Sequence, residues 1–217
     1  MVSKMLCNLV LSLFCASALA GSPVDRPTAA SPLIVALGDS LTSGQGIGQM
    51  NAYPAALQEL IDQAGLNLTV VNAGVPGDTS TRAANRIDRV LDGDVRILIV
   101  ALGANDGLRG TPIPQLKANF IRIVETAQAR GIVVLLCGME ALPVHGWDYS
   151  VQFHQAYREI ADRYHLELVP FLLMNVIGDA NMMQRDRMHP NAAGAREIAA
   201  NIWPYLKPLA EQASAPK

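Results

Sequence analysis

Five short apolar runs, nearly free of polar residues, constrain the fold of this chain more than any other feature. They cover residues 33–37, 68–71, 97–101, 132–137 and 166–169. Runs of leucine and β-branched residues without polar alternation are typical of strands that are covered on both faces. Stretches with helical periodicity separate them, at residues 53–63, 79–91, 114–129 and 149–164, and a last one follows Pro190 to about Leu206. This alternation predicts an α/β fold, a three-layer α/β/α sandwich with a five-stranded parallel sheet.

Candidate site residues follow three of these runs, where the predicted strands end. Ser40 stands in Gly38-Asp39-Ser40-Leu41 after the first run, Gly74 follows the second and Asn105 follows the third. Ligands of α/β sheets bind beyond the carboxyl ends of the strands, so we expect these residues at one edge of the sheet. A serine hydroxyl there can reach a substrate. The backbone amides of Ser40 and Gly74 and the side-chain amide of Asn105 can donate hydrogen bonds to an oxyanion.

A carboxylate and an imidazole lie three residues apart near the other end of the chain, in Asp186-Arg187-Met188-His189. A serine hydroxyl is inert near neutral pH unless an imidazole takes its proton, and the imidazole works best when a carboxylate fixes its tautomer. We therefore predict Ser40 as the nucleophile, His189 as the base and Asp186 as the residue that orients the base. Two metal ligands are the alternative, but no His-Glu-x-x-His motif or cysteine pair accompanies them.

Two further acidic residues stand beside these candidates, Asp39 next to Ser40 and Asp106 next to Asn105. Successive side chains on an extended chain point in opposite directions, so an acid and its neighbour should not face the same substrate. We interpret Asp39 and Asp106 as structural hydrogen-bonding groups.

These segments, in this order, resemble the sequence blocks of the SGNH (GDSL) hydrolases. Gly38-Asp39-Ser40-Leu41-Thr42-Ser43-Gly44 looks like the first block, Gly74 stands in the second, Gly103-Ala104-Asn105-Asp106 matches the third and Asp186-x-x-His189-Pro190 matches the last. Gly77-Asp78-Thr79-Ser80 and the run 103–110 are similar to the thioesterase I / lysophospholipase L1 branch. The resemblance implies the flavodoxin-like strand order 2-1-3-4-5. It also implies an esterase that needs no metal and no cofactor.

The loop after the fourth predicted strand departs from that branch. Many members have an Asn-Tyr-Gly-like triplet there, whereas this chain has Val144-His145-Gly146, followed by Trp147. Because the loop lies at the predicted active-site edge, we expect His145, Gly146 and Trp147 to contact the substrate.

Both termini are predicted to lie outside the folded domain. Residues 1–20 combine Lys4, an apolar stretch and the small-residue end Ala18-Leu19-Ala20, which is typical of a secretory signal. Residues 21–31 are predicted to be a disordered linker, 32–211 the hydrolase domain and 212–217 a disordered tail. Cleavage near Ala20 would leave Cys137 as the one cysteine, without an intramolecular disulfide. We therefore expect a periplasmic or secreted protein with no stable membrane insertion of the mature chain.

The charge balance argues against a nucleic-acid partner, since 17 basic residues face 19 acidic ones. We expect an exported, monomeric serine esterase that acts on a small acyl ester or thioester, including lysophospholipids as the resembled branch does. A carbohydrate O-deacetylase of the same fold is one alternative. A periplasmic binding module without turnover is another, although the complete set of catalytic groups argues against it.

Overall fold

The computed structural model describes residues 31–214, so the predicted signal at 1–20 and all but the last residue of the predicted linker lie outside the described residues. The strands are β1 (Leu33–Gly38), β2 (Thr69–Gly74), β3 (Val95–Ala101), β4 (Val133–Cys137) and β5 (Glu167–Val169). They pair in parallel in the order β2-β1-β3-β4-β5. The predicted fold class and strand order are confirmed.

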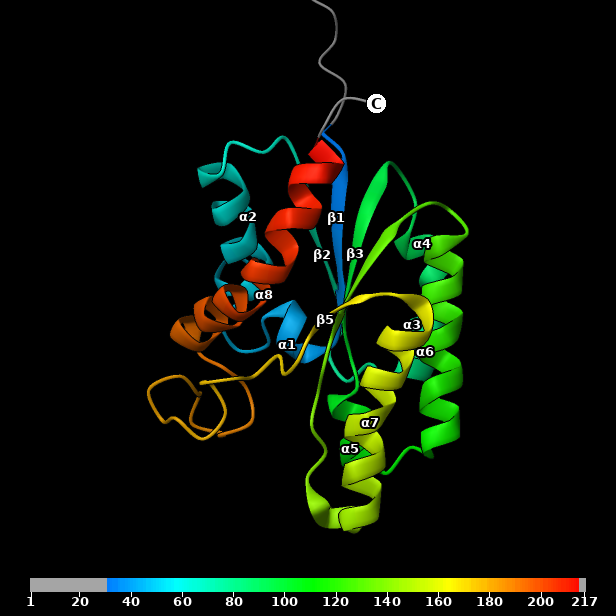
Figure 1. Cartoon of the computed structure of the whole chain (residues 1–217). Helices are drawn as coiled ribbons and strands as arrows, with labels where there is room; N and C mark the ends of the chain where they lie inside the picture. Colours follow the sequence, from blue (N-terminus) through cyan, green and yellow to red (C-terminus); the bar gives the residue numbers. More distant parts are fainter. Residues whose placement is uncertain (1–30, 215–217) are drawn as a thin grey trace, which may run out of the picture. The chain divides into compact units, whose positions relative to one another are not determined.

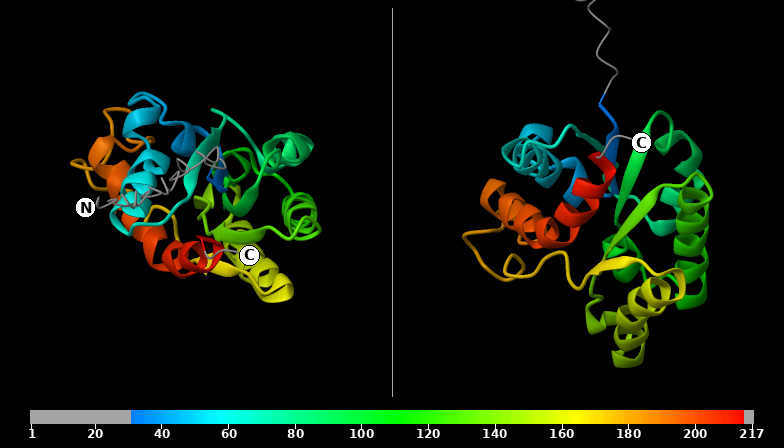
Figure 2. Two further views of the ribbon diagram at one scale, coloured as in Figure 1. Left: turned by 90° about the horizontal axis from the view of Figure 1, so that it is seen from above. Right: turned by 45° about the horizontal axis from the view of Figure 1, so that its top comes forward.

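Helices cover both faces of this sheet. One face carries α1 (Ser40–Ser43), α2 (Tyr53–Gln63) and α8 (Ala192–Ser214), and the other carries α3 (Ser80–Asn85), α4 (Ile87–Val90), α6 (Ile113–Gln128) and α7 (Trp147–Tyr164) (Figure 1). Two more views show the same layers from other directions (Figure 2). The helix α5 (Ala104–Arg109) follows β3, and the short 3₁₀ helices η1 (Gln49–Asn51) and η2 (Pro143–His145) lie in loops.

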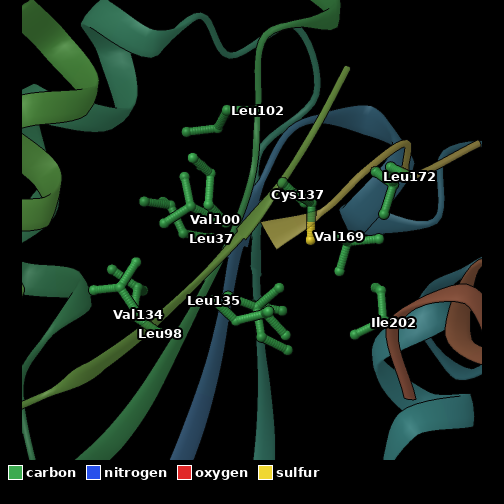
Figure 3. Close-up of a cluster of buried hydrophobic side chains, with 14 of the residues drawn as sticks. Leu37, Leu98, Val100, Leu102, Val134, Leu135, Cys137, Val169, Leu172 and Ile202 are labelled. Atoms are coloured by element: carbon green, nitrogen blue, oxygen red, sulfur yellow. The ribbon is translucent and has the colours of Figure 1, made fainter. Parts of the chain in front are cut away.

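The core forms where the strands meet these two helical layers. Residues 34–37 of β1 and 97–100 of β3 are almost completely buried, as expected for central strands covered on both faces. Figure 3 shows Leu98 and Leu135 of neighbouring strands in one cluster with Ile202 of α8. The central strands are therefore firmly packed, and the residues that follow their carboxyl ends are held close together. Within residues 31–214, no helix has the length and hydropathy of a membrane span.

Two helices differ from the sequence-based expectation. The predicted helix at 79–91 is interrupted at Arg86, whose backbone leaves the helical conformation between α3 and α4. The last helix runs to Ser214, so residues 212–214 are helical and not part of a tail. It continues past Pro204 and Pro208 because one face, including Ile202, Leu206 and Ala210, stays buried against the core.

Candidate active site

Ser40 begins α1 directly after β1. The Asp39 side chain caps this helix, since its Oδ1 accepts a hydrogen bond from the backbone N–H of Leu41 at 3.0 Å. Glycine is required at position 38, because a Cβ there would lie 1.9 Å from Oγ1 of Thr42. Only glycine therefore lets the helix fold closely over the strand end. This turn holds Ser40 half-buried at the carboxyl edge of the sheet.

The side chains of Ser40, His189 and Asp186 form a continuous chain of hydrogen bonds. Nε2 of His189 lies 3.1 Å from Oγ of Ser40, although 149 positions separate the two residues. Nδ1 of His189 lies 2.7 Å from Oδ2 of Asp186. An ionised carboxylate only accepts hydrogen bonds, so Nδ1 carries the proton and Nε2 is left to accept the Ser40 hydroxyl hydrogen. A general base needs this tautomer.

Asp186 is held in its ionised form by a tight turn. The backbone N–H of His189, the imidazole of His189 and the backbone N–H of Met188 all donate to its carboxylate, and these hydrogen bonds lower the pKa of Asp186 to about 2. Arg187 closes the turn in a left-handed conformation with φ of 54°. The carboxylate that orients His189 is therefore charged at neutral pH.

Gln184 ties the loop that carries His189 to the loop after α1. Its side-chain amide donates to the carbonyl oxygens of Gln45 at 2.7 Å and of Pro190 at 2.9 Å. Its backbone N–H donates to the carbonyl oxygen of His189 at 2.8 Å. Gln184 was not predicted from the sequence, because no local pattern indicates a contact across 139 positions.

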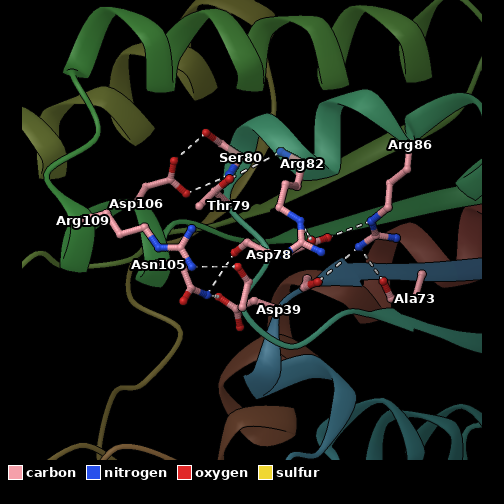
Figure 4. Close-up of polar contacts among 12 residues, drawn as sticks. Asp39, Ala73, Asp78, Thr79, Ser80, Arg82, Arg86, Asn105, Asp106 and Arg109 are labelled. Carbon is pink, nitrogen blue, oxygen red and sulfur yellow. Dashed lines mark hydrogen bonds and ion pairs between the residues drawn. The ribbon is translucent and has the colours of Figure 1, made fainter.

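Asn105 lies on the first turn of α5, with its side chain held between two acceptors (Figure 4). Its Nδ2 donates to the carbonyl oxygen of Asp78 at 3.0 Å and to Oδ2 of Asp39 at 3.3 Å. The neighbouring carboxylate of Asp106 accepts from the backbone N–H of Ser80 at 2.8 Å and from its Oγ at 2.7 Å. Both acids thus make structural hydrogen bonds, as the sequence analysis predicts.

Gly74 is not brought to this group, in contrast to the prediction. It pairs with Gly38 at the end of β2, and its N–H donates to Oδ1 of Asn72 at 3.0 Å. A Cβ at this position would lie 2.3 Å from the backbone nitrogen of Ser43, so Gly74 is packed behind α1. Its N–H is therefore directed at the Asn72 side chain, and Gly74 is absent from the lining of the cavity that holds Ser40 and Asn105.

Gly77, and not Gly74, lies beside Ser40 and Asn105. It lies in the turn before α3 with φ of 76°, and it lines the same cavity as Ser40 and Asn105. In the part of the chain that the structure describes, its N–H donates to no acceptor. The sequence carried a signal for this residue, since Gly77-Asp78-Thr79-Ser80 was part of the family resemblance.

A cavity of about 430 Å³ opens beside these groups. This volume lies in the range of small-molecule sites, roughly 300–1,000 Å³. Ser40, Gly77, Asn105 and His189 line it together with apolar side chains from five segments of the chain: Leu41, Leu108, Leu142, Leu173, Ile177 and Met188. Several of these apolar side chains are about half exposed, so an apolar ligand can contact them without displacing the protein core.

The three loop residues that were expected to contact the substrate are absent from the cavity lining: His145, Gly146 and Trp147. Nε2 of His145 lies 3.1 Å from the carbonyl oxygen of Leu108, so the loop packs against the rim of the cavity from outside. Trp147 begins α7 and is 75% exposed. Glu140, which precedes this loop and was not predicted, lines the cavity instead.

Comparison with known proteins identifies relatives over most of the chain. Residues 36–197 match the GDSL-like lipase/acylhydrolase family. Esterase TesA of Pseudomonas aeruginosa is 36% identical over 182 residues, which cover 83% of this chain and 90% of that protein. Arylesterase of Vibrio mimicus is 31% identical over 89% of this chain and 93% of its own length. Thioesterase 1/protease 1/lysophospholipase L1 of Escherichia coli is 32% identical over 85% of this chain and 87% of its own length.

Solved structures agree with these relatives. The crystal structure of TesA matches with a TM-score of 0.78 at 35% identity, covering 82% of this chain and 99% of that one. The psychrotrophic esterase EstA from Pseudoalteromonas sp., inhibited by monoethylphosphonate, matches with a TM-score of 0.77 at 28% identity, covering 82% of this chain and 98% of that one. The family match spans the strands and loops that carry Ser40, Asn105 and His189. The chain therefore belongs to the GDSL-like lipase/acylhydrolase family.

Proposed function

We propose that this chain is an exported serine esterase that hydrolyses carboxylic esters through an acyl-enzyme on Ser40. One observation carries the proposal, the hydrogen-bonded chain from Ser40 through His189 to Asp186 at distances of 3.1 and 2.7 Å. These groups line an open cavity with apolar walls, where an ester can approach the hydroxyl. The chemistry needs no group other than the side chains, the substrate and water.

The reaction follows from this geometry. Oγ of Ser40 attacks the acyl carbon of the ester while Nε2 of His189 takes the hydroxyl proton. The resulting imidazolium is stabilised by Asp186, which stays ionised. The tetrahedral intermediate collapses, the alcohol leaves with the proton from His189, and the acyl group remains on Ser40. A water molecule then gives its proton to His189 and attacks the acyl-enzyme, which releases the acid and restores Ser40.

The oxyanion of the intermediate needs hydrogen-bond donors that do not rearrange during the reaction. We assign this role to the backbone amides of Ser40 and Gly77 and to the side-chain amide of Asn105. All three residues line one cavity, and each comes from the carboxyl end of a different strand, β1, β2 or β3. Gly77 has this role rather than Gly74, because Gly74 lies outside the cavity and its N–H donates to Asn72.

The substrate class follows from the apolar lining of the cavity. Each methylene of an acyl chain that is transferred from water to such a surface contributes about 0.8 kcal/mol. We propose small acyl esters and thioesters as substrates, with lysophospholipids among them. The names of the relatives, which include an arylesterase and a thioesterase 1/lysophospholipase L1, support this range. The carbohydrate esterase among the structural matches is 20% identical and shows a shared fold alone.

Hydrolysis of a p-nitrophenyl ester series of increasing acyl length, run beside an acetylated oligosaccharide, tests the proposal. We expect hydrolysis of the aryl esters, covalent labelling of Ser40 by a fluorophosphonate, and loss of both in Ser40→Ala. Ser43→Ala, which changes the next serine of α1, is the matched control and should keep both. Faster cleavage of the acetylated oligosaccharide would indicate a deacetylase. Binding without turnover would indicate a binding module, and an active Ser40→Ala would refute the assignment of the nucleophile.

Export is tested separately from catalysis. We propose removal of residues 1–20, because their composition is that of a secretory signal. Expression in a Gram-negative host, followed by fractionation and N-terminal sequencing, should give a periplasmic protein that begins near Gly21. An uncleaved chain in the cytoplasm would contradict this proposal and leave the esterase proposal intact.

A further inference from the structure

Asp39 is a buried acid beside the nucleophile that the reaction described above does not use. Its side chain is completely buried, and in the part of the chain that the structure describes no cationic side chain forms an ion pair with it. Burial of a carboxylate without a cation is costly, so the hydrogen bonds that Asp39 accepts decide what it does. A helix cap alone does not require an acid, because serine or threonine provides the same acceptor.

The two oxygens of Asp39 serve two different partners. Oδ1 accepts from the backbone N–H of Leu41, which anchors the carboxylate to the helix of the nucleophile. Oδ2 accepts from Nδ2 of Asn105 at 3.3 Å. Asp39 therefore connects the segment that carries Ser40 to the side chain that we assign to the oxyanion hole (Figure 4).

The side chain of Asn105 can present either its oxygen or its nitrogen to a given direction, and only the nitrogen can donate. Its two Nδ2 hydrogens point to the carbonyl oxygen of Asp78 and to the carboxylate of Asp39. Both partners can only accept while Asp39 is ionised. The two acceptors allow the amide orientation in which Nδ2 of Asn105 faces Asp39, and they exclude the flipped orientation in which the side-chain oxygen would face them.

We propose that Asp39 is a positioning residue for ester hydrolysis and acts through Asn105. Its carboxylate holds Nδ2 of Asn105 in the orientation that the oxyanion needs. As the tetrahedral intermediate forms, the hydrogen that Asn105 donates to Asp39 is shared with the new oxyanion. The longer of the two resting hydrogen bonds, at 3.3 Å, is the one that yields. No proton leaves Asn105 or Asp39 in this step. The inference rests on the proposed esterase function.

A double-mutant cycle between Asp39 and Asn105 tests this proposal. Asp39→Asn keeps the size of the side chain and the Oδ1 acceptor for the Leu41 N–H, but it places an amide NH₂ donor opposite Nδ2 of Asn105. We expect it to lower kcat at least 10-fold with little change in KM, since the oxyanion donor is misoriented. Asn105→Ala should lower kcat by about 10²–10³-fold. The double variant should be no slower than Asn105→Ala alone, within about 3-fold, because the two residues act as one unit.

Two further variants separate positioning from a purely structural role. Asp39→Ser keeps a cap for the Leu41 amide but is too short to reach Asn105, so a positioning role predicts lost turnover with a normal thermal melt. Asp106→Asn is the matched control. It changes another completely buried acid beside Asn105 that bonds to Ser80, so its effect on kcat should be the same factor with and without Asn105.

Several results would overturn the inference without touching the proposed function. Asp39→Asn could lower kcat by the same factor in the wild-type and the Asn105→Ala backgrounds, which would make its role independent of Asn105. A fully active Asp39→Ser would reduce Asp39 to a cap. An Asn105→Ala enzyme with wild-type kcat would remove the group through which Asp39 acts. The esterase proposal is tested separately, by turnover of the aryl esters in the wild type and its loss in Ser40→Ala, and that variant also gives the background rate for the cycle.

Discussion

At the scale of single residues, Asp39 lowers the stability of the folded protein in the ionised form that its proposed role in the site requires. Burial raises the pKa of Asp39 to about 6, and the hydrogen bonds from Leu41 and Asn105 and the charge of His189 offset this only in part, while Asp106 adds to the rise. At neutral pH the folded protein therefore holds a carboxylate that would be more stable in water. Residues that act in function are often destabilising in this way.

The raised pKa of Asp39 predicts a pH-dependent effect of Asp39→Asn on stability. Because the folded-state pKa of about 6 lies above the ordinary value of 3.8, protonated Asp39 favours the folded state. Its contribution to the free energy of unfolding is complete below about pH 4 and falls by about 3 kcal/mol as the pH rises through 6. Asp39→Asn lacks this loss, so its stability relative to wild type should rise between pH 4 and pH 7.

Urea unfolding of both proteins at several pH values in this window measures the effect. His189 and Asp106 are the other charged groups that act on Asp39, and both are present in each protein, so the difference reports on Asp39. A stability difference that stays constant from pH 4 to pH 7 would mean that Asp39 titrates as in water.

Site residues with reactive side chains were predictable from the sequence. A site residue that contributes only its backbone amide was not. Ser40, Asn105, Asp186 and His189 carry reactive groups in recognisable motifs, and the structure brings all four to one cavity. Gly74 and Gly77 have no side chain to distinguish them. β2 leaves the sheet at Gly74, where its pairing with β1 ends, and Gly77 lies three residues further, in the turn before α3.

At the scale of elements, the break between α3 and α4 has a structural role. Arg86 at this break donates from Nε to Oδ2 of Asp78 at 2.8 Å and from Nη2 to the carbonyl oxygen of Ala73 at 2.9 Å. It thereby fastens the turn that contains Gly77 to the end of β2. Helical periodicity predicts one helix here because Ala83, Ala84 and Ile87 are all buried. This periodicity does not show that the Arg86 side chain contacts residues before the helix.

We expect Arg86→Met to destabilise the protein by about 2–4 kcal/mol, because it leaves the buried Asp78 carboxylate with Arg82 as its remaining cation. Turnover should fall with it, since the turn that carries Gly77 loses its attachment. Thermal melting and steady-state kinetics on one preparation give both values. Arg89→Met, an exposed arginine of α4, is the control and should leave both unchanged. An Arg86→Met protein with wild-type melting temperature would contradict the role.

The remaining elements were predictable where burial leaves a recognisable pattern of apolar residues. All five strands and the helices α2, α6 and α7 lie within a few residues of the expected bounds. The buried face of a strand or helix can be recognised in the sequence from the spacing of its apolar residues. The helices α1 and α5 have only 4 and 6 residues, too few for a period to be visible. The predicted helix ended near Leu206, before Pro208, whereas buried contacts extend α8 past that proline to Ser214.

At the scale of the whole molecule, the active site is a property of the tertiary fold. Its cavity is assembled from the segments after all five strands, and the apolar walls come from loops that are far apart in sequence. Substrate preference should therefore change when a side chain that lines the cavity changes in size, even though the proposed catalytic residues stay the same.

Ala141→Phe should shift the preference towards short acyl chains. Ala141 lines the cavity and is nearly buried, so a phenyl ring there occupies space that a longer acyl chain would fill. Each methylene that no longer finds an apolar contact loses about 0.8 kcal/mol, or roughly fourfold in kcat/KM. The ratio of kcat/KM for p-nitrophenyl octanoate and acetate measures the shift. Val144→Phe, at an exposed position outside the lining, is the control, and an equal shift in both variants would contradict the prediction.

The hydrogen bond between Ser40 and His189 also sets the time at which the chain becomes reactive. Its partners are 149 positions apart, so at synthesis rates of about 5–20 residues per second His189 is added roughly 7–30 s after Ser40. Until then the growing chain holds a serine without its base. With the proposed roles of Ser40 and His189, hydrolysis should begin only when the C-terminal segment has docked, with Gln184 bound to the loop after α1. In refolding, the return of activity would follow this last docking step and not the earlier formation of the sheet.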